Sequence, residues 1–116
     1  MVRETTGVPH ARVARVAELV PNVGHQVRID GWTYAVWLLP DGSVCVLDNA
    51  CEHIGGPIVD GAITEGCVVC PWHGWRYELA TGRRRTAIGD FPGIRSYRAW
   101  ILDGDVLADL PDNPLR

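Results

Sequence analysis

The sequence predicts an all-β fold, an antiparallel β-sandwich or barrel that carries a loop-rich subdomain. Its 116 residues include 13 glycines and 8 prolines, so the segments between these breakers are short. Most of the segments are rich in β-branched and aromatic residues, which favour strands. The length fits a single domain over residues 1–116 and leaves no room for a second catalytic domain.

In the first part of the chain, a short helical turn is expected at residues 16–19, because Pro21 and Gly24 follow it. Pro40 and Gly42 predict a hairpin turn, since proline presets the first turn dihedral and glycine accepts a positive φ. The strands predicted here are residues 11–16, 26–29, 32–39 and 44–47.

From Asn49 to about Arg85, a glycine interrupts every apolar run. We predict only two short strands in this segment, at residues 67–69 and 75–79. It therefore reads as a loop-built insert at about residues 49–85, held between the two halves of the β domain. Strands are expected again at residues 96–102 and 106–110, joined by a turn at residues 103–105.

The composition argues against several classes of protein. The formal net charge is −3, and the basic residues are scattered apart from Arg83 to Arg85, so nucleic acid is not expected as a partner. The longest apolar run, residues 35–39, is far shorter than the roughly 20 residues of a membrane-spanning helix. The first residues lack the apolar core of a signal peptide. We therefore expect a cytoplasmic protein without a membrane partner.

Two pairs of cysteine and histidine are the most informative feature of the chain. Cys51 and His53 lie on one glycine-rich loop, and Cys70 and His73 lie on another. Two thiolates and two imidazoles suit either zinc or a [2Fe-2S] cluster with two histidines on one iron. A common zinc finger has both cysteines on one hairpin, whereas here each loop supplies one of each type. Disulfides would leave the histidines unexplained, but spacing alone leaves zinc and iron open.

The residues around these four positions resemble the Rieske family. The matching segments are Cys51-Glu52-His53-Ile54-Gly55-Gly56-Pro57 with Gly61, and Val69-Cys70-Pro71-Trp72-His73-Gly74-Trp75 with Tyr77, Thr81 and Gly82. The resemblance implies one [2Fe-2S] cluster and argues against zinc. It implies that Cys51 and Cys70 bind a buried iron, while His53 and His73 bind an outer iron near the surface.

The resemblance also indicates the low-potential branch of that family. The respiratory high-potential branch carries a disulfide between two extra cysteines, at positions that here hold Gly56 and Trp72. It also carries a serine hydroxyl that donates to a bridging sulfide, where this chain has Trp75. We therefore expect a potential in the lower part of the roughly −150 to +300 mV Rieske window, although Tyr77 keeps one hydroxyl near the cluster.

Structural roles are expected for the other cysteines and histidines. Cys45 and Cys67 are interpreted as buried free thiols in strands rather than a redox pair. His10 and His25 are interpreted as surface residues. No histidine follows His73, so the chain lacks the 2-His-1-carboxylate iron site of a complete Rieske oxygenase.

Several aromatic and basic residues lie near the expected cluster. Trp72 and Trp75 are expected to cover it and exclude water rather than to conduct electrons. The run from Arg83 to Arg85 is interpreted as a solvated turn, with docking of an acidic partner as the alternative. The segment 91–93 resembles the proline-containing loop that closes over the cluster in this family. The remaining tryptophans, Trp32, Trp37 and Trp100, are expected to act in packing.

The resemblance implies a Rieske ferredoxin that is not an enzyme on its own. It would take one electron from a flavin- or iron-sulfur-containing reductase and pass it to a terminal oxygenase, such as a ring-hydroxylating dioxygenase. Three alternatives remain at this stage. They are the small subunit of a sirohaem nitrite reductase, with its large subunit as partner, a redox-sensing or binding module, and a zinc-binding structural module.

Overall fold

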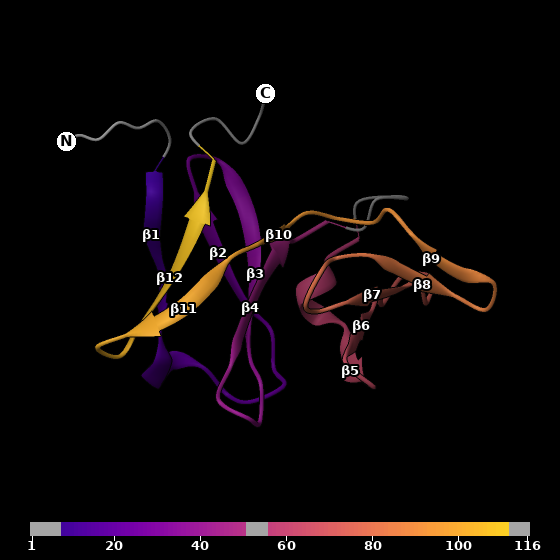
Figure 1. Cartoon of the computed structure of the whole chain (residues 1–116), viewed down its shortest axis with the longest axis horizontal. Coiled ribbons are helices and arrows are strands. Elements are labelled where there is room, and N and C mark those ends of the chain that lie inside the picture. Colours follow the sequence, from indigo (N-terminus) through magenta and orange to yellow (C-terminus); the bar gives the residue numbers. More distant parts are fainter. Residues whose placement is uncertain (1–7, 51–55, 112–116) are drawn as a thin grey trace.

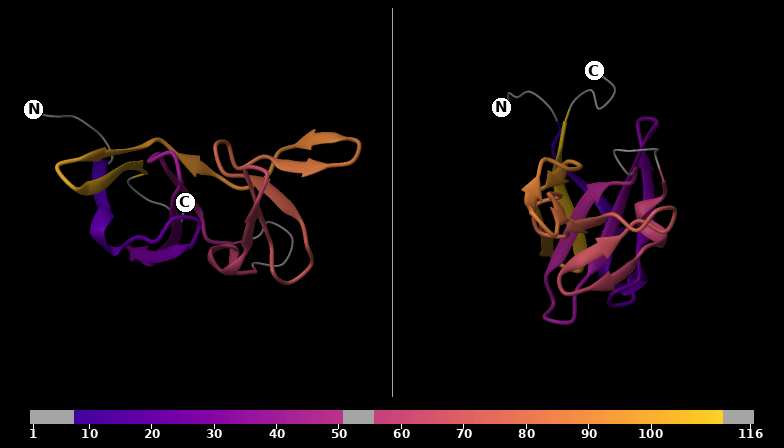
Figure 2. Two further views of the ribbon diagram at one scale, coloured as in Figure 1. Left: turned by 90° about the horizontal axis from the view of Figure 1, so that it is seen from below. Right: turned by 90° about the vertical axis from the view of Figure 1, so that its right-hand side faces the viewer.

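The computed structural model describes residues 8–50 and 56–111 of the chain, which form twelve strands and two short 3-10 helices (Figure 1). The strands are arranged in three sheets whose pairs are all antiparallel. Two sheets form a sandwich, and the third lies beside it (Figure 2). The all-β expectation is therefore confirmed. No helix in the described ranges is long and apolar enough to span a membrane.

The sandwich combines the two ends of the chain with its middle. One sheet has the order β1 (Val8–Arg15), β12 (Asp105–Leu110) and β11 (Ala99–Leu102), and η1 (Val16–Glu18) follows β1. The other sheet has the order β10 (Ser96–Tyr97), β4 (Val44–Asp48), β3 (Trp32–Leu38) and β2 (His25–Ile29). Between them lies a core that includes Tyr34, Val36, Val46, Val106 and Ala108.

The third sheet is a meander of five short strands that follows η2 (Ile58–Asp60). The strands are β5 (Ala62–Thr64), β6 (Cys67–Val69), β7 (Arg76–Glu78), β8 (Arg84–Thr86) and β9 (Gly89–Phe91). Buried side chains from η2, β6 and β7 share a second core with β3 and β4, and it includes Trp37, Leu47, Ile58, Val68 and Tyr77. The hairpin that carries Cys70 and His73 belongs to this part of the molecule.

Strand β3 connects the two cores because its side chains alternate between its two faces. Tyr34 and Val36 point into the sandwich core, whereas Ala35 and Trp37 point into the core shared with the third sheet. All four side chains are buried. This double burial explains why the sequence of β3 is almost continuously apolar rather than alternating between apolar and polar residues.

Two glycines let the chain cross itself where the third sheet joins the sandwich. Gly82, in the turn between β7 and β8, has a φ of +77°, and its carbonyl accepts a hydrogen bond of 2.9 Å from the Ile94 backbone amide. A Cβ on Gly82 would clash with the carbonyl oxygen of Ile94, and a Cβ on Gly93 would clash with that of Gly82. Side chains are therefore excluded at this crossing.

The structure differs from the sequence expectations in several places, of which the following bear on the site. The strand expected at residues 96–102 is divided at Arg98 into β10 and β11, which belong to different sheets. The strands β5, β8 and β9 were not expected. The interpretation of Arg83 to Arg85 as a solvated turn is wrong, because Arg84 and Arg85 lie in β8 and pair with Tyr77 and Arg76 of β7.

Candidate metal centre

The hairpin between β6 and β7 carries the second pair of expected ligands. Cys70 follows β6 directly, and its backbone amide donates a 2.7 Å hydrogen bond to the carbonyl of Trp75. The amide of Gly74 donates back to the carbonyl of Cys70 at 2.9 Å, which closes the loop. Within this loop the Cys70 Sγ lies 3.8 Å from the Nε2 of His73. The structure therefore brings these two expected ligands together.

The two side chains differ in depth. Cys70 is 1% exposed, whereas His73 is only partly buried and the neighbouring Trp72 is 59% exposed. The hairpin thus offers a sulfur on the inside and an imidazole near the surface. That order of donors fits a [2Fe-2S] cluster with cysteine at the inner iron and histidine at the outer iron.

Cys51 and His53, the first expected pair, lie outside the described residues. The described chain resumes at Gly56, which is three positions after His53. An ideal Cβ built on Gly56 would lie 3.0 Å from the Sγ of Cys70 and 3.2 Å from two ring carbons of Trp72. The backbone at Gly56 therefore passes close to the sulfur of Cys70, and a side chain at this position would require its neighbours to shift by a few tenths of an ångström. This contact between the loops, with the inner thiol and the outer imidazole, fits a cluster held between them.

Asn49 joins the two ends of the first loop. Its side-chain Oδ1 accepts a 2.8 Å hydrogen bond from the backbone amide of Val59 in η2, and its Nδ2 donates to the Oε1 of Gln26 at 3.0 Å. Its own backbone amide donates to the carbonyl of Thr33 at 3.1 Å. Asn49 is buried, so these bonds hold it against Val59 and Thr33. Asn49 was not predicted from the sequence, although a polar residue between a buried strand and Cys51 was a usable signal.

Asp48 anchors the end of β4 just before that loop. Its Oδ1 accepts hydrogen bonds from the Nε1 of Trp32 at 2.9 Å and the hydroxyl of Tyr97 at 2.6 Å. Its Oδ2 lies 3.3 Å from the Nε of Arg95, which donates to it. Burial, together with the hydrogen bond to Asp48, raises the pKa of Tyr97 well above its usual value. Trp32 was expected to act only in packing, but it is also part of this polar network.

Trp75 links His73 to an arginine of β8. The rings of His73 and Trp75 meet edge to face, with centroids 4.8 Å apart and an interplanar angle of 66°. The backbone amide of Trp75 lies 3.4 Å from the Nδ1 of His73. The guanidinium carbon of Arg84 lies 4.0 Å from the centroid of the Trp75 ring and 5.6 Å from that of Phe91. Nothing in the sequence distinguished Arg84 from Arg83 and Arg85.

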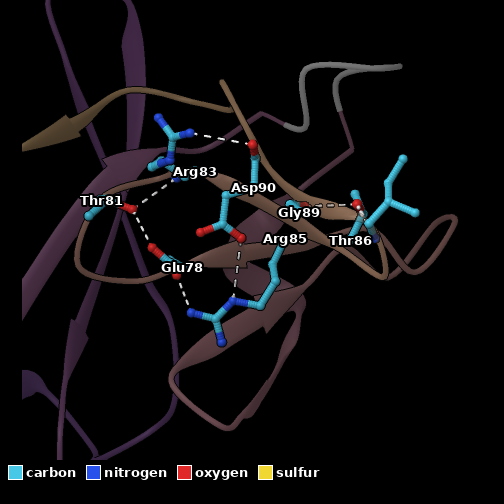
Figure 3. Close-up of polar contacts among 8 residues, drawn as sticks. Glu78, Thr81, Arg83, Arg85, Thr86, Gly89 and Asp90 are labelled. Carbon is cyan, nitrogen blue, oxygen red and sulfur yellow. Dashed lines mark hydrogen bonds and ion pairs between the residues drawn. The ribbon is translucent and has the colours of Figure 1, made fainter.

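The other two arginines of the run make contacts within the β8–β9 hairpin and its connection to β7 (Figure 3). Arg85 donates to the Oε2 of Glu78, and this hydrogen bond lowers the pKa of that carboxyl. Its Nε also lies 3.9 Å from an Asp90 carboxylate oxygen. Arg83 donates from its backbone to the Oγ1 of Thr81 at 3.1 Å and from its side chain to the carbonyl of Asp90 at 3.4 Å. These contacts favour a structural role for both arginines over partner docking.

The cysteines outside the motif are free thiols, as expected. Cys67 is buried and Cys45 is partly buried, and burial raises the pKa of the Cys45 thiol. His25 lies partly exposed in β2. The side chain of His10 lies outside the described part of the structure.

The chain is similar in sequence and in structure to known iron-sulfur proteins. A family model described as the Rieske [2Fe-2S] domain matches residues 10–98. The solved structure of a Sphingomonas yanoikuyae B1 ferredoxin is 31% identical, with a TM-score of 0.75 over 87% of this chain and 98% of that one. The ferredoxin of carbazole 1,9a-dioxygenase from Nocardioides aromaticivorans IC177 is 26% identical, with a TM-score of 0.77 over 90% of this chain and 99% of that one.

Among curated relatives, apoptosis-inducing factor 3 of Mus musculus is 34% identical over 86 residues, which are 74% of this chain and 13% of that protein. This chain spans less than a quarter of the length of the first curated relatives that it matches.

Proposed function

Because the chain belongs to the Rieske [2Fe-2S] family, we propose that it is an electron carrier that takes one electron from a flavin- or iron-sulfur-containing reductase and passes it to a terminal oxygenase. The observation that supports this proposal is that the chain matches two solved ferredoxins over almost their full length. At 31% identity, the match covers 98% of the Sphingomonas ferredoxin, whereas the curated relatives are much longer proteins. The carbazole 1,9a-dioxygenase ferredoxin supports a ring-hydroxylating system as the destination.

We assign the cluster ligands to Cys51 and Cys70 at the inner iron and to His53 and His73 at the outer iron. The depth of Cys70, the partial exposure of His73 and the approach of Gly56 to the Cys70 sulfur support this assignment. The assignment places the cluster within the insert at about residues 49–85 of a single domain.

The proposed chemistry is outer-sphere electron transfer. The cluster supplies the redox step when bound, gaining one electron from the reductase and losing one to the oxygenase without any bond being made or broken. The chain holds the ligands, keeps water from the inner sulfur through the buried site of Cys70, and leaves the edge of His73 close to the surface. No catalytic residue is required for this task, and a cytoplasmic location is part of the proposal.

The test begins with the composition of the purified holoprotein. We expect two irons and two acid-labile sulfides per chain, and one zinc without sulfide would overturn the cluster assignment. His73→Cys should lower the reduction potential or lose the cluster, because a thiolate adds negative charge where a neutral imidazole was bound. An unchanged potential in that variant would overturn the role of His73.

The carrier role is tested by stopped-flow spectroscopy with a flavin reductase, NADH and a ring-hydroxylating oxygenase. We expect the reductase to bleach the oxidised spectrum and the oxygenase to restore it faster than that oxygenase turns over. Copurification with a sirohaem enzyme, without electron delivery to the oxygenase, would instead identify a nitrite reductase subunit. Partner affinity that changes with redox state, without electron delivery, would identify a redox sensor.

A further inference from the structure

Arg84 differs from its two neighbours in the way its charge is accommodated. Arg83 donates to the carbonyl of Asp90 in β9, and Arg85 donates to the carboxylate of Glu78 in β7 (Figure 3). The Nε of Arg84 is buried and has no hydrogen-bond acceptor within residues 8–50 and 56–111. Arg84 also forms no ion pair within those ranges. Its charge is thus placed against aromatic rings instead of carboxylates.

The ring contacts explain how β8 accommodates this guanidinium. Its central carbon lies 4.0 Å from the Trp75 centroid, a distance at which the negative face of an indole attracts a cation. The Phe91 ring of β9 lies on the same group at 5.6 Å, and Phe91 and Arg84 are paired residues of adjacent strands. The planar guanidinium stacks on such faces and keeps its charge in partly buried surroundings, which a lysine ammonium does less well.

Trp75 places this charge next to an expected ligand. The same indole meets His73 edge to face at a centroid distance of 4.8 Å, so one aromatic ring contacts both the guanidinium and the imidazole. All three side chains are partly buried, and charges interact more strongly in partly buried surroundings than in open solvent. The three side chains come from the ligand loop and from β8, and the pairing of β7 with β8 fixes their arrangement.

We infer that Arg84, held by Trp75 and Phe91, is a positioning residue whose fixed positive charge raises the reduction potential of the histidine-ligated cluster. The inference rests on the proposed function, because it takes His73 as a ligand. With two sulfides, two thiolates and two neutral imidazoles, the cluster is neutral when oxidised and singly negative when reduced. A nearby cation stabilises only the reduced form, so Arg84 assists electron uptake from the reductase.

The direction in which the reduction potential changes when Arg84 is replaced distinguishes an electrostatic role from simple packing. If Arg84 served only to shield the site, its loss would admit water. Water solvates the more highly charged reduced form better, so the reduction potential would rise. If the charge itself acts on the cluster, its loss destabilises the reduced form, and the potential falls.

The experiment is protein-film voltammetry of the holoprotein at one pH and one ionic strength. Arg84→Met keeps much of the side-chain length but removes the charge, and Arg84→Lys keeps the charge. Arg83→Met is the matched control, since it removes an adjacent charge whose side chain donates to the Asp90 carbonyl. Iron and sulfide contents and the electron paramagnetic resonance spectrum of each reduced variant establish that the cluster is retained.

We expect Arg84→Met to decrease the equilibrium constant for one-electron reduction by roughly fivefold, for an effective dielectric between those of protein and water. Arg84→Lys should keep most of the wild-type value, and Arg83→Met should match the wild type. An unchanged or raised potential in Arg84→Met, or an equal fall in Arg83→Met, would overturn the inference. Absence of iron and sulfide from the wild-type protein would instead overturn the proposed function.

Discussion

Gly56 lies so close to Trp72 that a methyl group on Gly56 would be 3.2 Å from the indole ring. In the high-potential branch of the Rieske family, from which this sequence departs, the same two positions hold the cysteines of a disulfide. Here a glycine backbone and a broad ring meet where that disulfide would be. Trp72 is 59% exposed, and its ring lies against Gly56.

Gly56→Ala should therefore disturb the junction. The new methyl group would also lie 3.0 Å from the Sγ of Cys70, which is buried and has little room to move. We expect a loss of about 1–3 kcal/mol in the free energy of unfolding and a lower iron content. Urea denaturation and iron analysis measure the two effects.

Gly42→Ala is the control for Gly56→Ala. Gly42 has a φ of +91° and open space around it, so alanine there causes backbone strain of about 1–2 kcal/mol without touching the ligand loops. Its iron content should match the wild type. Full iron content and wild-type stability in Gly56→Ala would show that the loops tolerate a side chain at their junction.

Asn49→Ala should loosen the loop that contains Cys51 and His53. It would leave the buried amide of Val59 without its acceptor, and we expect a cost of about 1–3 kcal/mol together with weaker iron retention. Asn49→Asp keeps an acceptor for Val59 and should cost less. Gln26→Ala removes only the exposed partner of Asn49 and should be nearly neutral. Equal losses in Asn49→Ala and Gln26→Ala would contradict the bridging role of Asn49.

Tyr97 should make the protein sensitive to alkaline pH. Its pKa is raised in the folded state, mainly by burial and then by the hydrogen bond to Asp48, whereas the unfolded chain ionises near pH 10. The folded state therefore binds more protons above that pH, and the free energy of unfolding should fall as pH rises from about 10. Tyr34, whose pKa burial also raises, contributes in the same direction.

Tyr97→Phe should lose about 1.5–3 kcal/mol near neutral pH, because a hydrogen bond to a carboxylate is removed. It should also show a shallower decline in stability than the wild type above pH 10, since phenylalanine does not ionise. Denaturant unfolding at pH 8 and at pH 10.5 tests both points. Identical declines in the two proteins would mean that Tyr97 does not govern the alkaline transition.

The midpoint potential should lie in the lower half of the Rieske window and change little with pH around neutrality. The chain has no disulfide cysteines at Gly56 and Trp72 and no serine at Trp75 to favour reduction. Voltammetry between pH 6 and pH 8 measures this directly. A midpoint well above zero with a steep pH slope would show that this interpretation of Gly56, Trp72 and Trp75 is wrong.

Sequence patterns were sufficient to predict the strands β2, β3 and β4 and the hairpin that carries Cys70 and His73. The strand at Val44–Asp48 and the turn at Gly42 follow from local residue preferences. β8 could not be predicted in this way, because Arg84 and Arg85 are tolerated in a strand only by virtue of partners elsewhere in the chain. The rings of Trp75 and Phe91 and the carboxylate of Glu78 are those partners.

The supports of the candidate site were less predictable than its ligands. Asp48 binds Trp32, Arg95 and Tyr97, which are 16 to 49 positions away in the sequence. Such contacts depend on strand register and on which face each residue occupies, and neither is encoded in a local motif. The approach of Gly56 to Cys70 is of the same kind, because a glycine spacing does not identify the atom that it allows to come near.

Strand β3 is shared by the two cores, and this determines how the molecule should unfold. Ala35 and Trp37 belong to one core, and Tyr34 and Val36 belong to the other. Neither core can open fully without exposing one face of this strand, so the two should melt in one cooperative transition. In native-state hydrogen exchange, the amides of β3 should be among the slowest, and their exchange should report global unfolding. Separating the ligand-bearing part from the sandwich by truncation would then destroy both, since each supplies half of the burial of β3.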